Sequence, residues 1–241
     1  DPFDESGTRC TGRFVRNDWV KLADWQPCER PGQTRLVGSR IILEPLDWSR
    51  HREGLFAAIA GPENSSVWDY MPHGPYDEIQ EFETAFEADR EAGQWETLVF
   101  RQPDDGRIVG TSSYMRIRAA HGSVEIGSVA FGADLKRTAA ATEAMYLMAS
   151  HVFDTLGYRR YEWKCHNDNL ASKRAAERLG FVYEGTFRND MVVKGGSRDT
   201  AWFAMTDADW QRLKPDYNAW LSPENFDSSG CQRRRLGEMF Q

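Results

Sequence analysis

The feature that most constrains the fold is a strand, a helix and a second strand in direct succession near the middle of the chain. The segment Ser123–Phe131 (SVEIGSVAF) alternates as a strand does, and Arg159–Cys165 (RRYEWKC) is a second strand. Between them, Leu135–Asp154 (LKRTAAATEAMYLMASHVFD) carries apolar residues at helical spacing, and Gly157 ends the helix. Such a unit requires a parallel strand pair with a right-handed crossover. A ligand is then expected at the carboxyl ends of the two strands, where the N-terminus of the helix points.

The start of this helix has the character of a phosphate site. Two cations precede a threonine and three alanines, and small side chains let a ligand approach the backbone closely. Unpaired N–H groups and the positive end of the helix dipole favour an anion. The residues concerned are Lys136, Arg137, Thr138, Ala139, Ala140, Ala141 and Thr142. The alternative is that the alanines are only good helix formers behind a Thr138 N-cap.

The segments around this unit predict an α/β (α+β) fold with helices flanking a mixed sheet. The early strands are joined by short turns, so the sheet is expected to be mainly antiparallel with one parallel pair. The expected strands are 40–46, 97–101, 107–117, 123–131, 159–165, 181–186 and a hairpin over 191–205, and the expected helices are 48–60, 77–92, 138–156, 169–179 and 207–220.

The two ends of the chain lack periodicity and are expected to lie outside the main domain, which spans residues 35–221. Residues 1–34 are interpreted as an arm that packs on the domain through Trp19 and Trp25. Residues 222–241 are interpreted as a tail, with Arg233–Arg235 in solvent.

Charge and composition exclude several classes of protein. The 241 residues carry a net charge of −7, which argues against a basic nucleic-acid or membrane surface. The chain shows no signal-peptide pattern and no apolar run near the roughly 20 residues of a membrane span, so a cytoplasmic location is expected. The cysteines and histidines lack the spacing of metal ligands, so no metal is expected.

Three common ligand motifs are absent from the chain. No glycine lies between Gly132 and Gly157, so the G-x-G-x-x-G of a dinucleotide fold is missing. Neither a G-x-x-x-x-G-K-[ST] phosphate loop nor a G-x-S-x-G elbow occurs. A pyrophosphate cradle on a mixed sheet remains.

The order of elements together with this cradle resembles the GNAT family of acetyl-CoA-dependent N-acetyltransferases. The family pattern [Q/R]-x-x-G-x-[G/A] falls on Lys136–Ala141, with Ala139 in place of its first glycine. The following Thr142–Ala144 (TEA), and Asn169, Ser172 and Leu179-Gly180-Phe181, are similar to the branch of ribosomal-protein-alanine N-acetyltransferases. The resemblance covers most of the chain and implies acetyl-CoA as cofactor and a parallel strand pair that splays apart.

The resemblance also implies where the cofactor lies. The N–H groups of Val129, Ala130 and Phe131, where that strand leaves its neighbour, are expected to polarise the thioester carbonyl. Those of Arg137 to Thr142 are expected to hold the pyrophosphate, and Asn169 and Ser172 are expected beside the sulfur.

Transfer to an amine further requires a base and an acid, because an alkylamine is mostly protonated at neutral pH. Glu125 is the predicted base, on the face that alternation assigns to Val129 and Phe131, with Asp190 as the second candidate. Many relatives use a tyrosine on the later helix as the acid. That position is Ala176 here, and Ser172 is the substitute.

The acceptor is expected between the early helices, an aromatic loop and the last hairpin. Trp68, Tyr70 and Tyr76 are candidates for stacking on it or holding a cation, although they could equally pack the loop down. Arg188 and Asp199 are candidates for selecting a carboxylate or an amine, or for pairing with each other.

The leading hypothesis is an acetyl-CoA-dependent N-acetyltransferase that acts on a primary amine of a small molecule or peptide by direct attack within a ternary complex. The alternative is a non-catalytic acyl-CoA-binding module, which the substitutions at Ala139 and Ala176 motivate. A monomer or a homodimer is expected in either case.

Overall fold

A computed structural model describes residues 22–240, and its central feature is one eight-stranded sheet of order β1-β2-β3-β4-β5-β6-β8-β7. The strands are β1 Leu36–Val37, β2 Ile42–Pro45, β3 Glu96–Arg101, β4 Ile108–Arg118, β5 Ser123–Phe131, β6 Arg160–His166, β7 Val182–Val193 and β8 Gly196–Thr206. The β5–β6 pair is parallel and the other neighbours are antiparallel. The predicted α/β class, with a mainly antiparallel sheet and one parallel pair, is confirmed.

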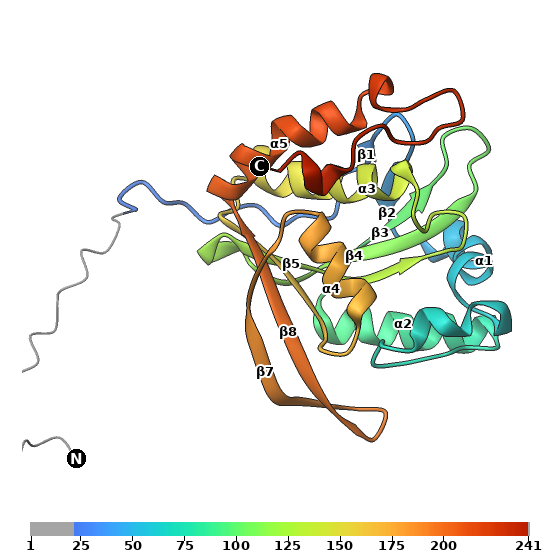
Figure 1. The fold of residues 1–241 in the computed structure, drawn as a ribbon. Coiled ribbons are helices and arrows are strands. Elements are labelled where there is room, and N and C mark those ends of the chain that lie inside the picture. The colour runs from blue at the N-terminus through green and yellow to red at the C-terminus, as the bar shows by residue number, and fades with distance from the viewer. Residues whose placement is uncertain (1–21, 241) are drawn as a thin grey trace, which may run out of the picture.

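Helices cover both faces of the sheet (Figure 1). They are α1 Trp48–Ile59, α2 Ile79–Gly93, α3 Ala139–Ser150, α4 Leu170–Arg178 and α5 Asp207–Leu221, with a 3-10 helix over Pro62–Trp68 and a π-helical turn over His151–Thr155 that extends α3. The helices α3 and α5 bury the larger core on one face, and α1 and α2 bury a second core on the other face. The expected helices are confirmed to within a few residues at their ends.

The parallel pair is short and its strands then part. Backbone pairing of β5 with β6 runs from Ser123 opposite Arg160 to Ile126 opposite Trp163. Both strands continue beyond that point, so the sheet opens between the C-terminal parts of β5 and β6. The predicted ligand position at the carboxyl ends of the pair coincides with this opening.

A β-bulge in β5 corrects the predicted alternation. Thr111 pairs with Ala130 and Ser113 with Gly127, so β5 contains one residue more than β4, and Ser128 has a left-handed φ of 48°. Beyond the bulge the faces exchange. Val129 and Phe131 pack against the α3–α5 core, whereas Ala130 is buried with α1 and α2. Strict alternation predicted that Glu125 shares a face with Val129 and Phe131. This prediction is wrong, because the bulge places Glu125 on the opposite face of the sheet.

The last two strands form one long hairpin that projects beyond the sheet (Figure 1). The sequence predicted separate strands over 181–186 and 191–205, but β7 is continuous and only its register shifts between Phe187 and Met191. At the hairpin tip, Lys194 Nζ donates a hydrogen bond to the carbonyl of Trp68, at 2.8 Å. The hairpin is thus fastened to the aromatic loop that follows α1.

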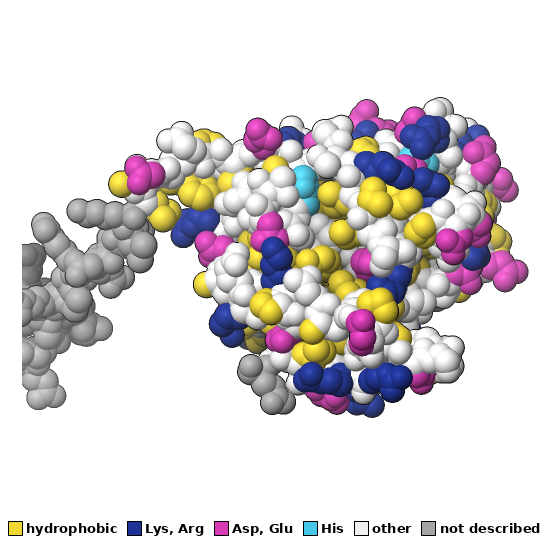
Figure 2. Space-filling model, turned by 90° about the horizontal axis from the view of Figure 1, so that it is seen from above, with side chains coloured by type: hydrophobic (Ala, Val, Ile, Leu, Met, Phe, Trp, Pro, Cys, Tyr) yellow, Lys and Arg dark blue, Asp and Glu magenta, His cyan; other side chains and the backbone are white. Residues whose placement is uncertain are grey.

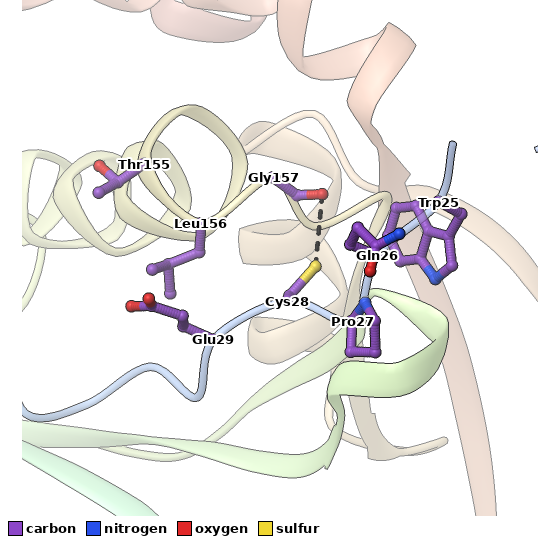
Figure 3. A pocket seen from close by; sticks show the side chains of 8 residues that line it. All are labelled: Trp25, Gln26, Pro27, Cys28, Glu29, Thr155, Leu156 and Gly157. Carbon is purple, nitrogen blue, oxygen red and sulfur yellow. Dashed lines mark hydrogen bonds between the residues drawn. The ribbon is translucent and has the colours of Figure 1, made fainter. Parts of the chain in front are cut away.

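The described part of the N-terminal arm packs on the domain. Trp25 Nε1 donates to the Ala120 carbonyl at 2.9 Å, and the Arg159 guanidinium lies over the indole. Trp19 lies outside the described residues. Farther along, the arm crosses the end of the α3 helix, where residues 25–29 and 155–157 line a pocket (Figure 3). Cys28 Sγ donates to the Gly157 carbonyl there, and burial raises the pKa of this thiol.

The C-terminal segment corrects a second expectation. Arg233–Arg235 are exposed, as predicted, but the segment is not a free tail. Leu236 is fully buried and Met239 is 9% exposed, and both belong to the core that α3 and α5 cover. Buried apolar side chains thus anchor a segment that the sequence predicted to be a tail.

Candidate active site

A cavity of about 550 Å³ passes through the opening between β5 and β6. Residues of both sheet faces line it, because Val129 and Phe131 lie toward α3 and Glu125 lies on the opposite face. The predicted site residues among its lining are Trp68, Tyr70, Glu125, Val129, Phe131, Lys136, Asn169 and Ser172. One cavity therefore joins the predicted cofactor region to the predicted acceptor region. Ala130 is buried against α1 and α2 and does not line it.

The start of α3 fits a pyrophosphate, with fewer donors than the sequence predicted. Thr138 is the N-cap, and its hydroxyl accepts from the N–H of Ala141 at 3.2 Å. The N–H of Thr142 lies within the helix, where the carbonyl four residues earlier accepts it. The N–H groups of Ala139 and Ala140 have no carbonyl one turn earlier in the helix, so they remain for a ligand. The N–H groups of Ala141 and Thr142 thus already have acceptors within the chain.

The backbone just before the helix adds to this fit. Arg137 has a φ of 65°, the left-handed conformation that turns successive N–H groups toward one anion. The side chains of Lys136 and Arg137 are exposed beside it. Ala141 is 8% exposed and belongs to the core, so its small size serves packing.

Glu125 is a buried carboxylate in the cavity wall. It is 1% exposed, and its Oε2 lies 3.3 Å from Lys164 Nζ and 3.8 Å from Arg116 Nε. Neither contact has hydrogen-bond geometry, so Oε2 has no partner among the described residues. Burial raises the pKa of Glu125, while the charges of Lys164 and Arg116 act to lower it. A carboxylate with a raised pKa is a stronger base than an exposed one.

Asn169 and Ser172 form the predicted cap of α4. Asn169 Oδ1 accepts from the N–H of Ser172 at 3.0 Å, and Ser172 Oγ accepts from Trp163 Nε1 at 3.0 Å. Since that hydroxyl accepts from the indole, its own proton is available to donate. Ala176 is fully buried and brings no hydroxyl group.

The aromatic candidates divide between the cavity and the core. Trp68 and Tyr70 line the cavity, and Tyr70 is 43% exposed. Tyr76 is buried against Trp68 with ring centroids 4.9 Å apart, and burial raises its pKa to about 12. Tyr76 thus supports Trp68 from the core and is not part of the cavity wall.

The three polar candidates of the hairpin lie outside the cavity wall. Arg188 and Asp190 are exposed. Asp199 accepts the backbone N–H of Asn189 at 2.7 Å, which fixes the register shift in β7. No ion pair joins Arg188 to Asp199 in the described chain. The hairpin residues that do line the cavity are Met191 and Arg198. The sequence did not reveal Arg198, because alternation alone does not show which charged side chain turns inward.

Residues 22–240 contain no helix of the length and hydropathy that a membrane span needs, and no cluster of three potential metal ligands. Acidic and basic side chains are interspersed over the face in Figure 2, with hydrophobic side chains between them.

Comparisons with known proteins now assign the family. The family model described as "Acetyltransferase (GNAT) domain" matches residues 40–182. The chain is 28% identical to the "Probable N-acetyltransferase YjcK" of Bacillus subtilis over 72% of this chain and 98% of that protein. A crystal structure of a GCN5-related N-acetyltransferase from Brucella melitensis is 42% identical, with a TM-score of 0.87, over 91% of this chain and 99% of that chain. A probable GNAT acetyltransferase from Chromobacterium violaceum is 38% identical, with a TM-score of 0.74, over 79% and 95% of the two chains.

The chain therefore belongs to the GNAT family and is an acetyl-CoA-dependent N-acetyltransferase. The resemblance to that family is confirmed. The narrower resemblance, to the ribosomal-protein-alanine branch, stays a prediction.

Proposed function

We propose that the protein transfers the acetyl group of acetyl-CoA directly to a primary amine of a small molecule or peptide, with both substrates bound at once. The observation that carries this proposal is the single cavity through the sheet, with Lys136, which precedes α3, at one side and Glu125 at the other. A cavity open to both regions lets two substrates meet without a covalent enzyme intermediate. The cofactor supplies an activated acetyl group as a thioester.

Glu125 takes the proton from the incoming amine, directly or through a water molecule. Its buried position and raised pKa suit a base that must compete with an alkylamine. The positive charge of Lys164, 3.3 Å from Oε2, opposes the effect of burial and favours the ionised carboxylate.

The cofactor-side residues bind and orient. The N–H groups of Ala139 and Ala140 and the cations Lys136 and Arg137 bind the pyrophosphate, and the unpaired end of β5 faces the thioester. Ser172 passes its hydroxyl proton to the departing sulfur and regains a proton from solvent water, while Trp163 holds the oxygen in place. Asp190 is exposed outside the cavity wall, so Glu125 is the better supported base.

The direct test incubates the purified protein with acetyl-CoA and a panel of primary amines and follows the release of free thiol. Amine-dependent release that falls at least 100-fold in Glu125→Gln, with acetyl-CoA affinity unchanged, supports the proposal. Acetyl-CoA binding with no thiol release for any amine would favour the non-catalytic module. The cytoplasmic location and the monomer or homodimer state remain predictions.

A further inference from the structure

Arg198 is a buried guanidinium without a carboxylate partner. It lies on β8 opposite Met191, is 6% exposed, and lines the acceptor part of the cavity. Its Nε donates to Thr200 Oγ1 at 3.2 Å, and its terminal nitrogens donate to no atom of the described residues. No carboxylate of residues 22–240 comes within ion-pair distance of it. An unpaired buried charge costs free energy, so a partner is expected from outside the chain.

The nearby carboxylates do not fill this role. Glu125 already faces Lys164 at 3.3 Å and Arg116 at 3.8 Å, so its negative charge is shared between two other cations. Asp190 is exposed and outside the cavity wall. Burial lowers the pKa of Arg198, and Cys165, Asp190 and Glu125 only partly oppose this. A guanidinium nevertheless stays protonated in proteins. The two other carboxylates of the cavity wall do not pair with Arg198 either, because Asp69 is exposed and Asp89 lies 3.0 Å from His73.

We infer that Arg198 binds a carboxylate of the acceptor, and that the substrate is a small amine that carries its carboxylate a few bonds from the amino group, as an amino acid does. This inference rests on the proposed function, because Glu125 must meet the amino group while Arg198 holds the carboxylate. Both side chains line the same cavity of about 550 Å³, and the charge of Glu125 acts on Arg198, so one small substrate can reach both. A guanidinium pairs with a carboxylate through two parallel N–H donors, which fixes orientation as well as position.

The same geometry predicts that an amine without a carboxylate is a poor substrate. Such an amine would leave Arg198 buried and unpaired in the complex, and sites with unpaired buried polar groups discriminate strongly. The residue therefore sets specificity and does not touch the reacting atoms.

The experiment compares matched acceptors that differ only at the carboxylate: leucine, leucinamide, 3-methylbutylamine and the 1-aminophosphonate analogue of leucine, with the methionine and phenylalanine series beside them. The kcat and KM of each are measured for the wild type, Arg198→Lys and Arg198→Met. Arg188→Met is the matched control, because Arg188 is an exposed arginine of the same hairpin outside the cavity wall.

We expect the wild type to prefer the amino acid over its amide and its decarboxylated amine by about 100-fold in kcat/KM. Arg198→Met should raise KM for the amino acid by a similar factor and should not lower kcat/KM for the decarboxylated amine, because it removes the unpaired charge, and Arg198→Lys should retain part of the preference. Equal use of acid and amine by the wild type, or an equal loss for all acceptors in Arg198→Met, would overturn the inference. A preference for the phosphonate would overturn the carboxylate assignment.

A binding measurement separates this inference from the proposed function. N-acetylleucine and N-(3-methylbutyl)acetamide are titrated calorimetrically into the wild type and Arg198→Met in the presence of CoA. If no acceptor is acetylated, acetyl transfer fails as a function. Tighter binding of the carboxylated ligand that is lost in Arg198→Met would still support the role of Arg198, whereas equal binding of the two ligands would refute it.

Discussion

Lys164 Nζ lies 3.3 Å from Glu125 Oε2, in ion-pair contact but without the geometry of a hydrogen bond. The pair sits on neighbouring strands just where β5 and β6 part. Lys164 also lies over the indole of Trp202, with Nζ 5.4 Å from the ring centroid. The charge of Lys164 therefore acts on Glu125 from a fixed position. Replacing Lys164 removes one charge that lowers the pKa of Glu125.

The first prediction concerns the pH dependence of kcat/KM. Glu125 accepts a proton only when ionised, so activity rises with pH through its pKa. Lys164→Met removes a positive charge that lowers this pKa, and the acidic limb should move to higher pH. The limb should disappear in Glu125→Gln. A limb that stays in place in Lys164→Met, on a protein that unfolds cooperatively, would assign the titration to another group.

The second prediction concerns the pyrophosphate site. Ala139 is the first residue of α3, and Thr138 before it has φ −102° and ψ 164°, an extended conformation that a following proline favours. Ala139→Pro should therefore keep the fold but remove one N–H donor. We expect CoA to bind roughly 10- to 100-fold more weakly, the range for a lost hydrogen bond to a charged group.

Ala139→Gly is the matched control for that experiment, because it keeps the N–H and restores the glycine of the family pattern. Its CoA affinity should equal or exceed that of the wild type. Calorimetry on all three proteins decides the matter. Equal affinity in Ala139→Pro would show that the helix start does not hold the pyrophosphate.

The third prediction separates two roles of Ser172. Ser172→Ala leaves the Trp163 N–H without its acceptor and should cost about 1–3 kcal/mol of stability. If the hydroxyl also protonates the departing sulfur, kcat should fall by a factor on the order of 100. Ser172→Thr keeps the hydroxyl group and should therefore retain most of the stability and most of the kcat of the wild type. A loss of stability with kcat unchanged would make Ser172 a purely structural residue.

The fourth prediction concerns the C-terminal segment. Leu236 is fully buried in the core beneath α3 and α5, so Leu236→Ala should lower the free energy of unfolding by about 2–5 kcal/mol. Arg234→Ala changes an exposed side chain of the same segment and should stay within about 0.5 kcal/mol of the wild type. Denaturation in urea measures both. Equal effects of the two changes would show that the segment is not anchored through its core contacts.

Periodicity and caps predicted most of the fold from the sequence. The N-caps Thr138 and Asn169, the glycine that ends α3 and the parallel crossover all lie where local patterns placed them. Leu236 and Met239 could not be found in this way, because single apolar residues in an irregular segment have no period.

The candidate site was predictable only in part. Glu125 and Ser172 line the cavity, as their strand and helix positions predicted, whereas Asp190 and Arg188 do not. Arg198 was missed because a charged side chain on a strand is read as exposed unless its tertiary surroundings are known. The acceptor pocket is formed by loop and hairpin residues that are far apart in the sequence, so local sequence patterns do not predict their contacts.

Because of the bulge at Ser128, the number of residues in β5 determines which face of the sheet each later side chain occupies. With one extra position, one strand presents Glu125 to the acceptor side and Val129 and Phe131 to the cofactor side. Deleting Ser128 would remove the bulge and move every later side chain of β5 to the opposite face of the sheet. Most substitutions of Ser128 would leave the alternation of side chains unchanged. A scan of substitutions in β5 would therefore miss the dependence of the site on strand length, whereas a scan of single-residue deletions would reveal it.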